Sequence, residues 1–171
     1  MSHGTLQYGR PLSARDAGVR ALWWREYAKS HTNFRVVTRD GVEIWGVHFN
    51  NDFSTLLIYC HGFSAGKNIY HITRLVERFA EEMDVIAFDF RGHGESGGEV
   101  STFGYLEVLD VKAALEYALS QPDVEHIGAW GGSMGGATLI RAAADFPEIE
   151  ALWIDSAFTS LDDEFDYLVP Y

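Results

Sequence analysis

The sequence predicts an α/β fold in which a mostly parallel, doubly wound sheet is opened by an antiparallel hairpin. From residue 55 onward, strand-length apolar runs alternate with segments of helical periodicity, the pattern of parallel strands joined by helices. Before that point, two runs rich in β-branched and aromatic residues flank an Asp40-Gly41 pair, which is typical of a hairpin turn. Because the later strands are apolar on both sides, we expect helices on both faces of the sheet.

Length and composition are those of one globular domain. The chain has 171 residues, 47% of them hydrophobic, which suffices for one core. Its formal net charge of -12 leaves no electrostatic footprint for phosphate backbones, so we expect no nucleic-acid partner. The single cysteine, Cys60, allows neither a disulfide framework nor a cysteine zinc site. No recognisable signal peptide or bilayer-spanning apolar stretch is present, so we expect a cytoplasmic protein.

The hairpin follows a lead-in segment. Residues 1–33 are expected to lie ahead of the domain, which occupies 34–171, and their apolar periodicity predicts a short amphipathic helix ending near residue 29. The two hairpin strands are expected at 34–38 and 42–49.

Four further strands alternate with three helices in the rest of the domain. The strands are expected at 56–60, 85–90, 127–130 and 151–154, and the helices at about 67–82, 103–120 and 134–146. The tail from Phe158 onward places apolar residues at spacings of three and four, which indicates the start of another helix.

The strongest chemical signal is the Gly-Gly-Ser-Met-Gly-Gly turn at 131–136, between an expected strand and an expected helix. A sharp turn of this kind forces its central residue, Ser133, towards positive φ, and small residues two positions away let the two backbones pass closely. The serine is thereby exposed at the carboxyl edge of the sheet as a nucleophile. The amide of Met134, in the first helical turn, is a natural donor to an oxyanion. The alternative is a turn in which Ser133 merely caps the helix.

A second turn, Cys-His-Gly-Phe-Ser-Ala-Gly at 60–66, follows the third expected strand at the same edge of the sheet. An oxyanion hole needs its second donor at this place. The amide of Phe63 is the candidate, with Gly62 allowing the loop to turn in tightly. His61 is expected to brace the loop through hydrogen bonds to backbone groups.

A third turn, Asp-Phe-Arg-Gly-His-Gly-Glu-Ser-Gly-Gly at 89–98, follows the next strand. A metal site built from Asp89, His93 and Glu95 is conceivable, but three ligands in a flexible loop have no defined geometry. We favour bracing of this loop by an ion pair between Arg91 and Asp89.

In order and spacing, these three turns resemble the α/β-hydrolase superfamily, from about residue 34 to the end of the chain. The resemblance is strongest to small serine esterases, monoglyceride-lipase-like enzymes and serine-aminopeptidase-like hydrolases. It implies Ser133 as the nucleophile, the amides of Phe63 and Met134 as the oxyanion hole, and neither metal nor cofactor. Asp155 matches a family position that is usually not the triad acid. Structural roles are implied for four residues of the other two turns, namely His61, Asp89, Arg91 and His93.

The chain departs from the family order, in which the catalytic histidine follows the serine. All seven histidines precede Ser133, and a serine without a base is a poor nucleophile near neutral pH. A sheet ending at 151–154 would also leave an apolar edge, with Trp153 poorly packed. We therefore expect the N-terminal part of a longer hydrolase, its last strands absent and its acid and histidine beyond Tyr171.

Three alternatives would also account for the missing histidine. A partner chain completes the site, or the protein is naturally short and has lost catalysis. The third alternative is a triad inside the chain, with Asp155 orienting His61 or His93 as base.

The leading functional hypothesis is a cofactor-independent serine hydrolase. It would cleave carboxylic esters, or amides, of a small-molecule substrate through an acyl-enzyme on Ser133. The rival is a non-catalytic α/β-hydrolase-like binding or scaffold module, which the missing histidine favours and the intact turn opposes. A nucleotide-binding protein is disfavoured because neither Walker spacing nor G-x-G-x-x-G follows the first parallel strand. The sequence leaves the substrate and the oligomeric state undetermined.

Overall fold

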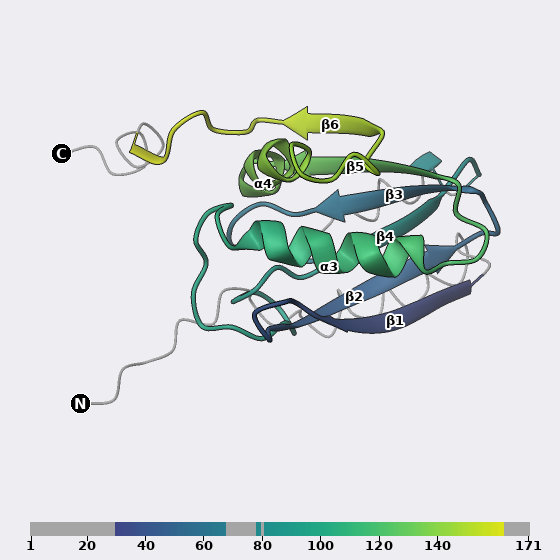
Figure 1. The fold of residues 1–171 in the computed structure, drawn as a ribbon, viewed down its shortest axis with the longest axis horizontal. Helices are drawn as coiled ribbons and strands as arrows, with labels where there is room; N and C mark the ends of the chain where they lie inside the picture. Colours follow the sequence, from purple (N-terminus) through teal and green to yellow (C-terminus); the bar gives the residue numbers. More distant parts are fainter. Residues whose placement is uncertain (1–29, 68–77, 80, 163–171) are drawn as a thin grey trace, which may run out of the picture.

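The computed structural model describes residues 30–67, 78–79 and 81–162 (Figure 1). The helices expected before residue 30, over 67–82 and in the tail fall wholly or largely outside the described residues. The described strands are β1 Ser30–Val37, β2 Glu43–Asn50, β3 Thr55–Cys60, β4 Asp84–Phe88, β5 His126–Gly132 and β6 Ala151–Asp155. The described helices longer than one turn are α3 Glu107–Leu119 and α4 Met134–Ala142.

The six strands form one sheet in the order β1-β2-β4-β3-β5-β6. β3 pairs in parallel with both β4 and β5, and β5 pairs in parallel with β6. β2 is antiparallel to β1 and to β4, so the hairpin forms one side of the sheet. The hairpin turns through Gly41, whose φ of 86° suits a glycine. The predicted fold class, a mostly parallel sheet opened by an antiparallel hairpin, is confirmed.

The main core lies between the sheet and the two described helices, which cover the same face (Figure 1). Side chains from adjacent strands, such as Ile58 and Phe88, pack there with Leu115 of α3 and Leu139 of α4, all of them buried. A smaller cluster around Phe49 and other strand residues lies apart from this core. The strands are therefore apolar on both sides, as their sequence predicts for the interior of a parallel sheet.

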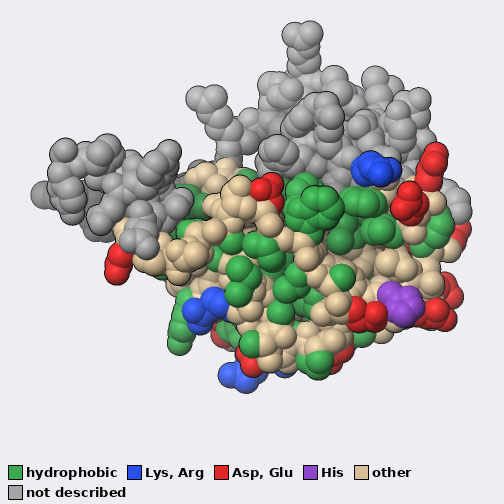
Figure 2. All heavy atoms as spheres, turned by 90° about the horizontal axis from the view of Figure 1, so that it is seen from above, with side chains coloured by type: hydrophobic (Ala, Val, Ile, Leu, Met, Phe, Trp, Pro, Cys, Tyr) green, Lys and Arg blue, Asp and Glu red, His purple; other side chains and the backbone are tan. Residues whose placement is uncertain are grey.

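β6 forms the edge of the sheet opposite the hairpin, and its apolar side chains are poorly covered by the described residues. Trp153 is 66% exposed and Leu152 is 39% exposed. They border an open apolar groove of about 890 Å³ that also touches Leu57, Phe79 and Trp130. Figure 2 looks onto this edge and shows hydrophobic side chains gathered there, with charged side chains around them. The expectation that Trp153 has little to pack against is confirmed.

Charged residues interrupt the apolar sequences of α3 and α4. Among the residues that the structure describes, no helix combines the length and the apolar character needed to cross a membrane.

Candidate active site

Ser133 occupies a sharp turn between β5 and α4. Its φ of 50° and ψ of −117° lie in a region that L-residues rarely adopt, which confirms the positive φ predicted from the sequence. The turn is fixed from both directions. Ser133 N donates a hydrogen bond to Asp155 O of β6 at 2.8 Å, and Ser133 O accepts one from Ala137 N at 3.0 Å. The surrounding structure therefore compensates for the backbone strain at the serine.

Two glycines flank Ser133 because strand and helix backbones meet there. A Cβ on Gly131 would lie 2.6 Å from Gly135 C, and a Cβ on Gly135 would overlap Cys60 O. Both contacts are with backbone atoms, which cannot swing aside. The spacing of small residues in the sequence thus has the steric cause that was expected.

Met134 is the first residue of α4, and its side chain and backbone face different surroundings. The side chain is fully buried in the main core, with its sulfur 3.3 Å from Ser101 Oγ. The backbone amide belongs to the first turn of the helix, whose N–H groups have no acceptor within the helix. This is the position where a helix offers hydrogen bonds and a positive dipole end to an anion.

The loop after β3 lies directly against the serine turn. A Cβ on Gly62 would lie 3.4 Å from both Ser133 Cβ and Gly132 O, so the gap between the two turns is no wider than one methyl group. Phe63 is the next residue, and its ring packs against Phe103 with centroids 4.5 Å apart. The structure therefore brings together the three residues predicted for the site, Phe63, Ser133 and Met134, from two separate loops.

His61 braces the loop with both ring nitrogens. Nε2 accepts a hydrogen bond from Phe90 N at 3.0 Å, and Nδ1 donates one to Gly62 O at 2.7 Å. Because a backbone N–H only donates, the ring must be neutral with its proton on Nδ1. Burial lowers the pKa of His61 to about 4, which favours the same neutral form.

His93 is held in the same way from the loop after β4. Nε2 accepts a hydrogen bond from Ser64 N at 3.3 Å, and Nδ1 donates one to Arg91 O at 3.0 Å. The nitrogens of both histidines thus serve backbone groups, so neither ring is arranged to accept the proton of Ser133. The geometry opposes a triad that uses His61 or His93 as base.

Asp89 joins the loops after β3 and β4. Its carboxylate accepts hydrogen bonds from Lys67 N at 2.7 Å and from Glu95 N at 2.9 Å. The buried Lys67 ammonium contacts Asp89 and also lies 2.6 Å from Glu95 Oε2. Room for the carboxylate comes from two glycines: a Cβ on Gly66 would lie 2.9 Å from Asp89 Oδ1, and one on Gly94 would overlap Oδ2.

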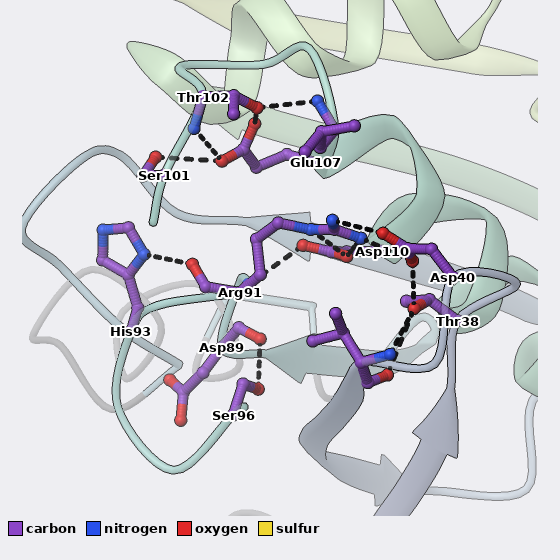
Figure 3. Close-up of polar contacts among 12 residues, drawn as sticks. Thr38, Asp40, Asp89, Arg91, His93, Ser96, Ser101, Thr102, Glu107 and Asp110 are labelled. Carbon is purple, nitrogen blue, oxygen red and sulfur yellow. Dashed lines mark hydrogen bonds and ion pairs between the residues drawn. The ribbon is translucent and has the colours of Figure 1, made fainter. Parts of the chain in front are cut away.

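The predicted ion pair between Arg91 and Asp89 is wrong. The Arg91 guanidinium points the other way, towards Asp110 of α3 and Asp40 of the hairpin turn (Figure 3). Its Nη2 lies 2.8 Å from Asp110 Oδ1, and its Nη1 lies 2.8 Å from Asp40 Oδ2. The hydrogen bond from Arg91 holds the pKa of Asp40 well below its usual range. Arg91 therefore ties the loop after β4 to a helix and to the hairpin.

Glu107, at the start of α3, fixes the segment just before the helix, which includes Ser101 and Thr102 (Figure 3). It accepts hydrogen bonds from Thr102 N at 2.7 Å, Ser101 Oγ at 2.9 Å and Gly104 N at 2.8 Å. Burial acts to raise the pKa of Glu107, but the hydrogen bonds from Thr102 and Gly104 outweigh it and lower the pKa. A buried carboxylate with this many donors holds Phe103 and its neighbours in place.

The sequence analysis did not single out Lys67, Glu107 or Asp110. All three are charged residues that are buried. Glu107 and Asp110 lie in the first turn of α3 among apolar residues, and this interruption of an apolar pattern was the available signal.

The contacts of the third turn do not support a metal site there. The Asp89 carboxylate pairs with the Lys67 ammonium, and both ring nitrogens of His93 are hydrogen-bonded to backbone groups. Within residues 30–67, 78–79 and 81–162, no three His, Cys, Asp or Glu side chains form a metal-binding group.

Comparison with known proteins identifies the fold family. Residues 55–171, which include both turns of the candidate site, match the model of the alpha/beta hydrolase fold family. The chain belongs to the α/β-hydrolase fold family. An esterase of Pyrococcus furiosus superposes with a TM-score of 0.80 at 27% identity, covering 96% of this chain and 62% of the esterase.

Sequence relatives of this α/β-hydrolase chain are considerably longer than the matched segment. The protein bem46 of Schizosaccharomyces pombe is 34% identical over 120 residues, which are 67% of this chain and 39% of that protein. The thiohydrolase aneE of Aspergillus aculeatus is 35% identical over 123 residues, 67% of this chain and 38% of that enzyme. The chain thus spans less than half the length of these relatives.

Proposed function

We propose that this chain provides the nucleophile and the oxyanion hole of a serine hydrolase that cleaves carboxylic esters. The observation that carries the proposal is the strained backbone of Ser133, held against the loop that bears Phe63. A φ of 50° at a non-glycine residue has a cost of order 1–3 kcal/mol, and such strain concentrates at functional sites. A serine that merely capped a helix would not need this conformation.

The chemistry follows from the placement of the groups. Ser133 Oγ attacks the ester carbonyl while a base takes its proton, and the amides of Phe63 and Met134 hydrogen-bond the developing oxyanion. The tetrahedral intermediate collapses to an acyl-enzyme, and the proton passes to the departing alkoxide, which leaves as the alcohol. Water, activated by the same base, then releases the acid and regenerates Ser133.

The base is proposed to come from outside the described residues. His61 and His93 direct their nitrogens to backbone groups, and their loops have a bracing role. Asp155 lies next to the serine turn through its backbone carbonyl, but its carboxylate accepts a hydrogen bond from Ser156 Oγ at 2.8 Å. These contacts favour a histidine supplied by another segment.

An ester with an apolar acyl group is the proposed substrate. Phe63 and Phe103 present an aromatic pair beside the serine turn, which suits an apolar chain better than a charged one. The Pyrococcus furiosus protein is an esterase and the Aspergillus aculeatus relative is a thiohydrolase, so acyl transfer to water is the chemistry these names share.

The test is covalent labelling of the chain with a fluorophosphonate, read by intact mass, because the probe reports an activated serine without assuming a substrate. We expect one label on the unmodified chain and none on the Ser133→Ala variant. The pH dependence of the labelling rate locates the base. A rate that rises with hydroxide and with added imidazole indicates a base outside the chain, whereas a plateau near pH 7 indicates one within it.

The second candidate is a non-catalytic module that keeps the fold without the chemistry. The position of all seven histidines before Ser133 favours it. It predicts that a folded sample remains unlabelled at every pH and with imidazole present. A working oxyanion hole alone retains roughly 10³–10⁴-fold catalysis over water when a triad residue is missing. Complete absence of labelling therefore separates the two candidates.

A further inference from the structure

The peptide units on both sides of Phe63 are held by histidines. On one side, Nδ1 of His61 donates to Gly62 O at 2.7 Å. On the other, Nε2 of His93 accepts from Ser64 N at 3.3 Å. The first contact fixes the peptide unit that contains the Phe63 N–H, and the second fixes the peptide unit that follows it.

His93 adds a side-chain contact to its hydrogen bond. Its ring meets the Phe63 ring edge to face, with centroids 5.6 Å apart and an interplanar angle of 84°. The next residue, Ser64, has a φ of 58°, so the loop adopts a conformation that a non-glycine residue reaches only when neighbours enforce it. A hydrogen bond to Ser64 N, together with packing on Phe63, is a means of enforcing it.

The anchor of His93 is itself rigid. His93 donates to Arg91 O, and Arg91 is fixed by Asp110 of α3 and by Asp40 of the hairpin turn (Figure 3). Because the Arg91 side chain is buried and held on both sides, its own backbone carbonyl, which accepts the hydrogen bond from His93, also has a fixed position. A line of contacts therefore runs from the helix and the hairpin, through Arg91 and His93, to the loop beside Ser133.

We propose that His93 is a positioning residue that, together with His61, keeps the Phe63 amide directed towards the oxyanion. The inference rests on the proposed function, because it concerns the second donor of the oxyanion hole. His93 does not touch the reacting atoms and exchanges no proton with them. His93 holds the peptide unit that follows Phe63, through Ser64 N, and packs on the Phe63 ring. His61 holds the peptide unit that contains the Phe63 N–H, through Gly62 O.

The expected effect follows from the value of one oxyanion donor. Removing such a donor lowers the rate about 10²–10³-fold in enzymes of this mechanism. Loss of His93 leaves the Phe63 amide held through Gly62 O alone, so we expect a smaller decrease, about tenfold.

The experiment measures the rate of fluorophosphonate labelling of the 171-residue chain at pH 8. His93→Phe keeps a ring beside Phe63 and removes both hydrogen bonds, whereas His93→Gln offers Ser64 N a carbonyl acceptor. Ile127→Val is the matched control, because Ile127 is buried at the start of β5, away from both turns, and the change costs about 0.5–1.5 kcal/mol of stability. Hydrogen exchange of the Ser64 amide, followed by NMR, reports the contact itself.

We expect His93→Phe to label about tenfold more slowly, His93→Gln to recover part of the rate, and Ile127→Val to match the unmodified chain. The Ser64 amide should be protected in the unmodified chain and in His93→Gln, and exposed in His93→Phe. Labelling of His93→Phe at the unmodified rate, or equal losses in Ile127→Val, overturns the inference alone, as does a fast-exchanging Ser64 amide in the unmodified chain. An unmodified chain that is folded yet unlabelled overturns both the proposed function and the role of His93.

Discussion

Lowering the pH from 7 to 5 should destabilise the fold through His61. The buried, neutral ring has a pKa of about 4, against an ordinary value of 6.5. In the unfolded chain the imidazole binds a proton near pH 6.5, whereas in the fold it resists one until about pH 4. The unfolded state therefore binds more protons between these values, and stability falls as the pH drops through this window.

The size of the effect follows from proton linkage. A full shift of this kind corresponds to about 3 kcal/mol, and about 2 kcal/mol of it is lost between pH 7 and pH 5. Urea unfolding followed by tryptophan fluorescence measures the change, since the chain carries five tryptophans.

A variant isolates the contribution of His61 from that of other titrating groups. His61→Gln offers an amide oxygen to Phe90 N and does not titrate, so its stability should change by about 2 kcal/mol less than that of the unmodified chain over the same pH range. His126→Gln serves as control, because it removes an exposed histidine whose surface ion pair with Glu150 contributes little to stability. Equal pH dependence in His61→Gln and the unmodified chain would refute the reasoning.

Three further predictions concern the turn, the loop and the sheet edge. Gly135→Ala places a Cβ against Cys60 O, so unfolding in urea should show a loss of about 1–3 kcal/mol or no folded state. Arg91→Met leaves the buried Asp110 carboxylate without its cation and should lower the free energy of unfolding by about 3–5 kcal/mol in the same assay. Adding Asp110→Leu should restore part of this stability, and a double variant without any recovery would contradict the pairing. Trp153→Ser removes an exposed ring from the groove beside β6. The variant should bind less of a hydrophobic dye, with little change in the free energy of unfolding. Unchanged dye fluorescence would show that the dye does not bind in this groove.

Local features of the fold followed from local features of the sequence. The apolar runs gave each described strand within a few residues, and the Asp40-Gly41 pair gave the hairpin turn. The glycines around Ser133 predicted its positive φ, because backbone clashes in a sharp turn depend on residues next to each other in the chain. The close approach of Gly62 to Ser133 also agrees with the expected meeting of two turns at one sheet edge.

Partners distant in the chain were decided by the tertiary structure. The sequence places Asp89 two residues from Arg91, yet Asp89 binds Lys67 and Arg91 binds Asp110, 19 positions away. Which buried charge meets which depends on how separate elements pack, since an ionised group out of water must find whichever opposite charge the fold brings within reach.

The sequence by itself determined the class of sheet, the serine turn and the loop that lies beside it. Each of these features depends on short-range periodicity and on the positions of glycines. The tertiary structure alone decided the strand order, the neutral form of His61 and the hydrogen bond from Ser64 N to His93. These features depend on contacts between residues that are far apart in the chain, and a hydrogen bond is assigned only when the positions of both its donor and its acceptor are known.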